Sequence, residues 1–228
     1  MGILINPYTF QVSRTDYTDD FSTDNGWVDN SGTYTYQSGY LQLNSNTGII
    51  VLDLEDSNVF GAGNLLSNTE NYFEYGFNII SESGADNEQM NGFSTVDETG
   101  GKTTSQAWLG ACSLIGYGVT PSANGMYIES TASGNVPVAG GSSSLAAYNW
   151  STGNFRIKQR RLSATTCSVE IWDSAGTVLR ATSGSHTILS SEGNDLKYCK
   201  FMVYAASASV YAIQIPDIII NNGASTPP

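Results

Sequence analysis

The chain has 228 residues, of which only 13% are charged, and its formal net charge is −12 at pH 7. This length allows one full-sized β-sandwich domain, and the acidity argues against nucleic acid and anionic membranes as partners, because both would repel the chain. The 13 tyrosines, 8 phenylalanines and 4 tryptophans suit half-buried pleated strands better than long helices.

Residues 1–16 are expected to form an N-terminal arm. They lack the basic segment and cleavage site of a secretory signal, and nothing later in the chain predicts a membrane-spanning helix. The arm carries five apolar or aromatic side chains that need a covering surface: Ile3, Leu4, Ile5, Tyr8 and Phe10. We therefore expect the arm to pack on the domain or on a neighbouring subunit.

The segment 17–27, YTDDFSTDNGW, concentrates carboxylates before an Asn-Gly turn. Its three closely spaced aspartates are Asp19, Asp20 and Asp24. If Gly26 is aligned with the glycine of a helix-loop-helix calcium loop, Phe21 and Ser31 occupy the first and last ligand positions, and neither is a carboxylate. That motif is excluded, whereas a calcium site built with other loops stays open. The favoured interpretation is that these aspartates accept backbone hydrogen bonds in turns.

From residue 33 onward the sequence predicts strand after strand. The predicted strands are 33–37, 39–45, 48–55, 72–81, 91–98, 106–116, 125–130, 154–162, 166–173, 177–183, 196–207 and 210–222. In 154–162, Phe155 and Ile157 fall on one face and Arg156 and Lys158 on the other. No window shows the apolar period of a helix. The pattern predicts an all-β, antiparallel jelly-roll sandwich over 17–222.

Two segments are expected to lie outside the strands. Residues 130–148 are rich in glycine and serine and predict a long surface loop. Residues 223–228 end in two prolines and predict a loose C-terminal tail.

Four of the chain's 9 basic residues lie together in one predicted strand: Arg156, Lys158, Arg160 and Arg161. The favoured interpretation is the solvent face of a strand, with Glu170 as a cross-strand partner. An anion-binding patch is disfavoured in so acidic a chain. A third interpretation is a contact with the acidic N-terminal part of another subunit.

The three cysteines, Cys112, Cys167 and Cys199, are odd in number and widely spaced. We favour buried free thiols over a disulfide framework or a zinc cluster, although a Cys167–Cys199 bridge stays open.

Several stretches resemble the concanavalin A-like lectin/glucanase sandwich, the superfamily that includes laminin G-like domains. The entry DDFSTDNGWVDNSGTYTYQSGYLQLNS contains the Asp20-Phe21 pair, the Gly26-Trp27 turn and a G-x-L-x-L strand from Gly39. NFRIKQRRL with CSVEIWDSAGTVL, and the closing VYAIQIPDIIINN, are similar to the middle and last strands of the superfamily. The resemblance covers 17–222 and implies a concanavalin A-like jelly roll.

No catalytic set accompanies this resemblance. Retaining glucanases of the superfamily carry Glu-x-Asp-x-x-Glu on one strand, which places paired carboxylates on one face, and the chain lacks that spacing. Its single histidine, His186, does not accompany a Gly-x-Ser-x-Gly motif, and the glycine-rich runs lack the Walker pattern. We therefore predict a non-enzyme that needs no cofactor.

Two functions are compatible with these features. The opening MGILINPYTF is similar to the starts of phage structural proteins, which favours a virion protein of the capsid-decoration, cement or tail-associated kind. It would be located in the virion and bind itself and another virion protein through the arm and through Arg156, Lys158 and Arg160. The alternative is a lectin-like module that holds surface glycans on aromatic rings, with Tyr148, Trp150 and Trp172 as candidates.

Overall fold

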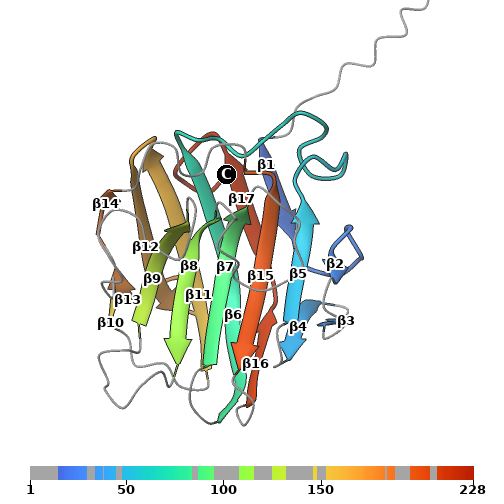
Figure 1. The fold of residues 1–228 in the computed structure, drawn as a ribbon, viewed down its shortest axis with the longest axis vertical. Coiled ribbons are helices and arrows are strands. Elements are labelled where there is room, and N and C mark those ends of the chain that lie inside the picture. Colours follow the sequence, from blue (N-terminus) through green and yellow to red (C-terminus); the bar gives the residue numbers. More distant parts are fainter. Residues whose placement is uncertain are drawn as a thin grey trace, which may run out of the picture.

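The computed structural model describes residues 15–29, 34–37, 39–44, 48–83, 87–94, 108–115, 125–131, 146–147, 153–182, 184–187, 196–205 and 210–228. Over these ranges the chain forms two antiparallel sheets that lie face to face (Figure 1) and contains no helix. The predicted all-β class is therefore confirmed. In the described part of the chain, no helix is long and apolar enough to cross a membrane. The predicted arm, apart from residues 15 and 16, and most of the predicted loop 130–148 lie outside these ranges.

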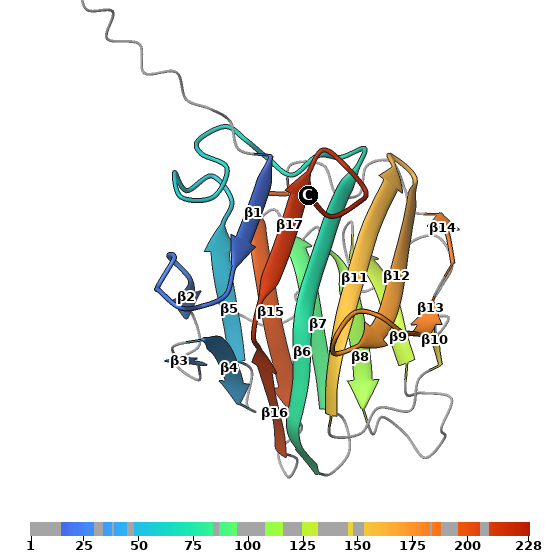
Figure 2. The ribbon, with the colours of Figure 1, turned by 180° about the vertical axis from the view of Figure 1, so that it is seen from behind.

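Sheet A contains ten strands among the described residues. Its main path runs β13 (Leu179–Thr182), β12 (Thr166–Asp173), β11 (Gly153–Ser163), β6 (Asn71–Ser83), β16 (Val210–Ile215), β4 (Tyr40–Asn44) and β3 (Tyr34–Gln37). Three further strands join it: β17 (Ile218–Asn222) pairs with β6, β1 (Asp16–Asp19) pairs with β17, and β14 (His186–Thr187) pairs with β12. Within the described residues β1 has one neighbour, so it forms an edge of the sheet (Figure 2).

Sheet B contains seven strands among the described residues. In spatial order they are β10 (Ala146–Ala147), β9 (Gly125–Thr131), β8 (Trp108–Ile115), β7 (Asn87–Ser94), β15 (Tyr198–Ala205), β5 (Gly48–Asp53) and β2 (Val28–Asp29). Chain neighbours β7, β8 and β9 form a meander, whereas β15 inserts between β5 and β7. Both sheets therefore mix segments from distant parts of the chain, as in a jelly roll.

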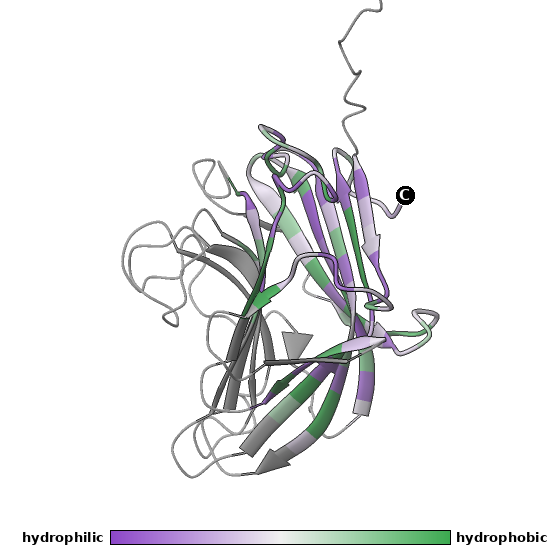
Figure 3. Ribbon diagram, turned by 90° about the vertical axis from the view of Figure 1, so that its right-hand side faces the viewer, coloured by the Kyte–Doolittle hydropathy of each residue, from purple (hydrophilic) through white to green (hydrophobic). Residues whose placement is uncertain are grey.

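The core lies between the sheets and follows the period-two alternation. Purple and green residues alternate along the strands of sheet A in Figure 3. On β6, Phe73 and Tyr75 face inward, and Phe73 packs its ring 4.9 Å from Phe93 and 5.9 Å from Phe201 of sheet B. All four rings are at most 2% exposed. Aromatic rings from both sheets thus fill the interior, where burial of each contributes about 1.5–3 kcal/mol.

The long strand β6 changes partner along its length. Residues 71–75 pair with β17, and residues from 78 onward pair with β16. Between them, Pro216 and Asp217 interrupt the predicted strand 210–222, because proline has no N–H for a sheet ladder. At this point Gly76 donates its N–H to the Asp217 carbonyl at 3.1 Å, and its Cα lies against the Pro216 ring. Glycine is required here because a larger residue would collide with the ring.

Gly76→Ala is expected to destabilise the protein by about 2 kcal/mol, because a Cβ at Gly76 would lie 2.5 Å from Pro216 Cγ and 3.0 Å from Cδ. Urea unfolding followed by tryptophan fluorescence measures the loss. The double variant Gly76→Ala/Pro216→Ala removes the obstructing ring and should be more stable than the sum of the two single effects. Strict additivity would show that the ring is not the cause.

The predicted C-terminal tail, residues 223–228, accepts hydrogen bonds from sheet A. Residues after β17 turn back over the outer face of sheet A (Figure 2). Arg160 donates to the Ser225 carbonyl at 2.9 Å, and Asn221 donates to the Thr226 carbonyl at 3.0 Å. These two bonds to backbone carbonyls hold a segment that its composition alone would leave mobile.

Both cysteines whose side chains are described, Cys167 and Cys199, are buried thiols that form no disulfide. This confirms the favoured interpretation for these two residues, and the open alternative of a bridge between them is not realised. Burial raises the pKa of the Cys199 thiol well above its ordinary value, so the reactive thiolate is disfavoured in the native state.

Candidate functional site

The strand β1 places Asp19 inside the protein. Its four residues alternate between exposed and buried, so Tyr17 and Asp19 point inward while Asp16 and Thr18 point outward. Asp19 is 4% exposed and accepts three hydrogen bonds: from the Tyr17 hydroxyl at 2.8 Å, the Phe21 N–H at 2.7 Å and the Trp27 indole N–H at 2.9 Å. Burial and the nearby Asp19 carboxylate raise the pKa of Tyr17 above its ordinary value. The Tyr17 phenol therefore stays protonated and remains a donor.

The chain turns sharply after Asp19. Phe21 adopts a φ of 55°, in the left-handed region, while its side chain is fully buried. The Phe21 carbonyl accepts the Gly39 N–H at 2.7 Å, and its ring lies 5.8 Å from the Trp27 ring. Non-glycine residues enter this region at a cost of about 1–3 kcal/mol when surrounding contacts enforce it. The Asp19 bond to the Phe21 N–H supplies one of these contacts.

The other two aspartates of the segment occupy separate turns. Asp20 is exposed and accepts the Ser22 N–H at 3.0 Å, and Asp24 accepts the Gly26 N–H at 3.0 Å. Hydrogen bonding by the Ser22 hydroxyl, and next by the Ser22 N–H, lowers the pKa of the Asp20 carboxyl. Among the described residues no group of three or more side chains is arranged to hold a metal ion. The hydrogen bonds agree with the favoured turn interpretation, and calcium binding by Asp19, Asp20 and Asp24 stays a prediction without support.

The free edge of β1 is lined by backbone groups. The Asn222 N–H donates to the Thr15 carbonyl directly opposite it, so these two residues form a hydrogen-bonded pair of the antiparallel ladder. Such pairs recur at every second residue, so Tyr17 and Asp19 also bond to β17. The backbone N–H and C=O groups of Asp16 and Thr18 therefore point to the opposite, free edge. Within the described part of the chain these groups have no hydrogen-bond partner.

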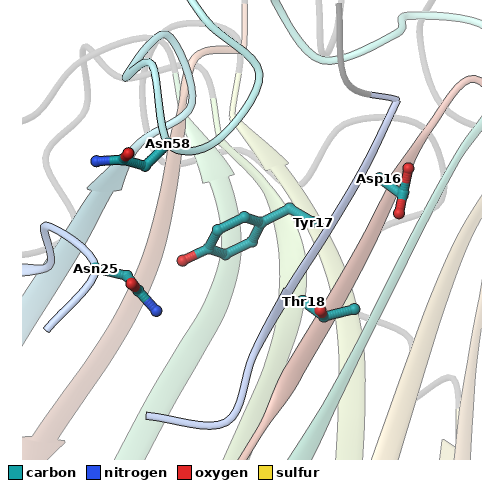
Figure 4. A pocket seen from close by; sticks show the side chains of 5 residues that line it. All are labelled: Asp16, Tyr17, Thr18, Asn25 and Asn58. Atoms are coloured by element: carbon teal, nitrogen blue, oxygen red, sulfur yellow. The ribbon is translucent and has the colours of Figure 1, made fainter. Parts of the chain in front are cut away.

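A pocket of about 370 Å³ lies along this free edge, and we call it the β1-edge pocket. Its lining residues are Asp16, Tyr17, Thr18, Asn25 and Asn58. Figure 4 shows the Tyr17 ring extending from β1 toward Asn25, in the loop before β2, and Asn58, in the loop after β5. Tyr17 is only 5% exposed, so its ring forms a floor rather than a projecting platform. The pocket thus combines unpaired backbone groups, two carboxamides and one aromatic ring.

None of these five residues was a predicted site residue. The segment 17–27 was notable in the sequence for its carboxylates, yet the pocket uses Thr18, Asn25 and the edge of the strand. The Asn25-Gly26 turn was a usable signal, because such a turn places polar side chains at the surface. The contribution of Asn58 depends on a contact between distant segments and had no local signal.

The predicted basic strand lies on the outer face of sheet A, and its charges are paired within the chain. Arg156 donates to Glu74 at 2.9 Å and to both oxygens of Asp217 at 2.7 and 2.8 Å. The side chains of Arg156 and Glu74 are 17% and 8% exposed. Burial opposes the charged form of Arg156, but Asp217 and Glu74 outweigh it and raise the pKa of the guanidinium.

The neighbouring cations are paired in the same way. Arg160 lies 3.4 Å from Glu170, and Lys158 stands opposite Glu170 in the strand register. The Lys158 ammonium lies 4.0 Å from Glu74 and 4.4 Å from the centre of the Trp172 ring. The predicted cross-strand partner Glu170 is therefore confirmed, and a contact of Arg156, Lys158 and Arg160 with another subunit stays a prediction.

Arg161 does not share this outer face, so the solvent-face interpretation is wrong for it. By alternation it points toward the other side of β11, and it is 1% exposed. Its guanidinium donates to the carbonyls of Ser163 at 3.2 Å and Ala164 at 2.9 Å. These bonds satisfy a buried charge that would otherwise be costly.

The predicted aromatic platform is described only in part. Tyr148 and Trp150 lie outside the described residues. Trp172 lies on the outer face of β12, where its indole N–H donates to Glu170 at 2.9 Å and Lys158 covers one ring face. β12 is separated from β1 by β11, β6 and β17, so Trp172 is not part of the β1-edge pocket.

Comparison with solved structures identifies the fold. The chain is similar to peanut lectin, with 13% identity and a TM-score of 0.59 over 90% of this chain and 95% of that chain. It is similar to lectin I-B4 from Griffonia simplicifolia, with 14% identity and a TM-score of 0.59 over 91% and 98%. It is also similar to part of the GH43 protein BlXynB from Bacillus licheniformis, with 14% identity and a TM-score of 0.51 over 90% of this chain and 39% of that chain.

No protein-family model matches the chain, and no curated protein is similar to it in sequence. The structural likenesses establish a concanavalin A-like β-sandwich fold, which confirms the fold that the sequence resemblance implied. Two further interpretations stay predictions. The non-enzyme interpretation is one, because the same fold occurs within a GH43 protein. The virion role is the other, because neither the comparisons nor the described contacts support it, and Ile3, Leu4, Ile5, Tyr8 and Phe10 lie outside the described residues.

Proposed function

We propose that the chain is a carbohydrate-binding, lectin-like module that holds a sugar in the β1-edge pocket. The observation that carries this proposal is the pocket itself (Figure 4), which is lined by Asp16, Tyr17, Thr18, Asn25 and Asn58. It lies beside the strand edge at which the backbone groups of Asp16 and Thr18 have no partner among the described residues. The likeness to two lectins supports the same class of ligand.

The chemistry of the lining suits a saccharide. Sugar hydroxyls both donate and accept hydrogen bonds, and a carboxamide or a strand edge offers both kinds of group in a small space. The Tyr17 ring is almost fully buried, so hydrogen bonding rather than ring stacking would hold the sugar. A volume of about 370 Å³ is at the small end of ligand sites. We therefore expect one or two sugar rings to be recognised at a time.

Thr18→Pro is expected to weaken sugar binding about threefold to tenfold, the loss of one net hydrogen bond. Proline removes the N–H of Thr18, which faces the pocket, while leaving the β1–β17 ladder intact, and an edge strand tolerates proline at such a position. Asn25→Ala should weaken binding by a similar factor through its carboxamide. Glycan-array screening of the wild-type protein, followed by calorimetric titration of the best ligand, measures both effects.

Asn154→Ala is the matched control for Asn25→Ala, because Asn154 is an exposed asparagine on β11, which β6 and β17 separate from β1. It should bind like the wild type, and thermal melts should show all variants folded at the titration temperature. Failure of the wild type to bind any glycan on the array would overturn the proposal. Equal binding by Thr18→Pro and Asn25→Ala would move the sugar site away from the β1-edge pocket.

A further inference from the structure

The charges around the β1-edge pocket are almost all of one sign. The two segments that line it, 15–27 and 53–63, contain no lysine, arginine or histidine. Their seven carboxylates are Asp16, Asp19, Asp20, Asp24, Asp53, Glu55 and Asp56. Among the described cations, Lys197 reaches this region, and its ammonium lies 3.8 Å from Glu55. Seven carboxylates on the two lining segments, with no cation on either segment, leave a negative potential over the pocket.

Asp16 is the carboxylate best placed to act on a ligand. It is exposed at the pocket itself, and within the described part of the chain it has no ion-pair or hydrogen-bond partner. Most of the other carboxylates accept local bonds: Asp19 is enclosed by three donors, while Asp24 and Asp56 accept the N–H groups of Gly26 and Asn58. A positively charged ligand group would therefore find a carboxylate at Asp16 that has no partner among the described residues, whereas a negatively charged one would find no cation on either lining segment.

We propose that the β1-edge pocket selects sugars carrying a protonated amine, such as glucosamine oligomers, and discriminates against sugars carrying carboxylates. This inference rests on the proposed sugar site. Amine and carboxylate sugars of one length offer nearly the same hydroxyls and differ in charge. A difference in affinity between the amine sugar and the carboxylate sugar therefore measures the electrostatic potential of the site rather than its hydrogen bonding.

The test compares three oligosaccharides of equal length by calorimetric titration: a glucosamine oligomer, its neutral N-acetylated form and a uronate oligomer. At mildly acidic pH, where the amine is protonated and most carboxylates are ionised, the glucosamine oligomer should bind about twofold to fivefold more tightly than the neutral form. The uronate should bind more weakly than both. Raising the salt concentration from about 0.02 M to 1 M should remove most of these differences, because the Debye length falls to about 3 Å.

Asp16→Asn should bring the ratio of the affinity for the glucosamine oligomer to that for the neutral oligomer close to one. Asp173→Asn is the control, because it removes one half-buried carboxylate at the end of β12, which β11, β6 and β17 separate from β1. Equal affinities for the amine and neutral sugars, or an equal effect of both variants, would overturn the inference. Neutral sugars would still bind in that case and the proposed function would stand, whereas loss of all sugar binding would contradict the proposed function itself.

Discussion

Asp19→Ala is expected to lower the free energy of unfolding by about 3 kcal/mol or more, and to be the most damaging change in the segment 17–27. Alanine removes the acceptor for the Tyr17 hydroxyl, the Phe21 N–H and the Trp27 indole N–H, all of which are buried. Each buried donor left without a partner costs about 1–3 kcal/mol. Urea unfolding monitored by tryptophan fluorescence measures the change, and Trp27 itself should report it.

Asp20→Ala is the matched control for this experiment. Asp20 is the next residue and carries the same charge, but it is exposed and accepts a single backbone bond. Its replacement should leave the unfolding midpoint almost unchanged. Equal effects of the two substitutions would show that the buried hydrogen bonds of Asp19 do not stabilise the fold. Asp19→Asn, which keeps one acceptor oxygen, should fall between the wild type and Asp19→Ala.

The same measurement separates the two interpretations of this acidic segment. If Asp19 serves only as an acceptor for protein donors, neither calcium nor a chelator should shift the unfolding midpoint of the wild type. A ligand that binds only the native state raises stability in proportion to the logarithm of its concentration. A midpoint that rises with calcium would therefore show that these carboxylates hold the ion.

The strands and the all-β fold could be predicted from the sequence, because the alternation of apolar and polar residues that marks a strand is a local pattern. Phe155 and Ile157 were assigned to one face of a strand and Arg156 and Lys158 to the other, and β11 places them so. The predicted single strand 210–222 is instead two strands, β16 and β17, which pair with different parts of β6. Pro216 was the available signal for this break, since proline is disfavoured within a central strand.

The site was less predictable because it depends on which strand edge stays unpaired. The alternation in β1 indicates that Tyr17 and Asp19 face inward, which separates buried Asp19 from exposed Asp20 in a segment where all three aspartates first looked equivalent. No local pattern indicates that Thr18 lies at a free edge, or that Asn58 faces it from a loop some 40 residues later in the chain. Pairing between distant segments decides both.

Arg156→Met is expected to destabilise the protein by about 2–3 kcal/mol. The guanidinium holds two carboxylates, Glu74 and Asp217, and Glu74 is largely buried on the outer face of sheet A. Methionine retains much of the apolar packing of the arginine stem. It leaves the buried Glu74 carboxylate without its main partner, however, and an uncompensated buried charge is strongly destabilising. Urea unfolding at neutral pH measures the loss.

The double variant Arg156→Met/Glu74→Gln tests the cause of that loss. Glutamine removes the unpaired charge and can still accept a hydrogen bond from Tyr72, whose hydroxyl donates to Glu74 in the wild type. The double variant should therefore be more stable than Arg156→Met alone. The loss of stability in Arg156→Met comes from the unpaired negative charge of Glu74 and not from the lost contact with Arg156. A double variant that is less stable than Arg156→Met would show that Glu74 is adequately paired without Arg156, with Lys158 at 4.0 Å as the partner that suffices.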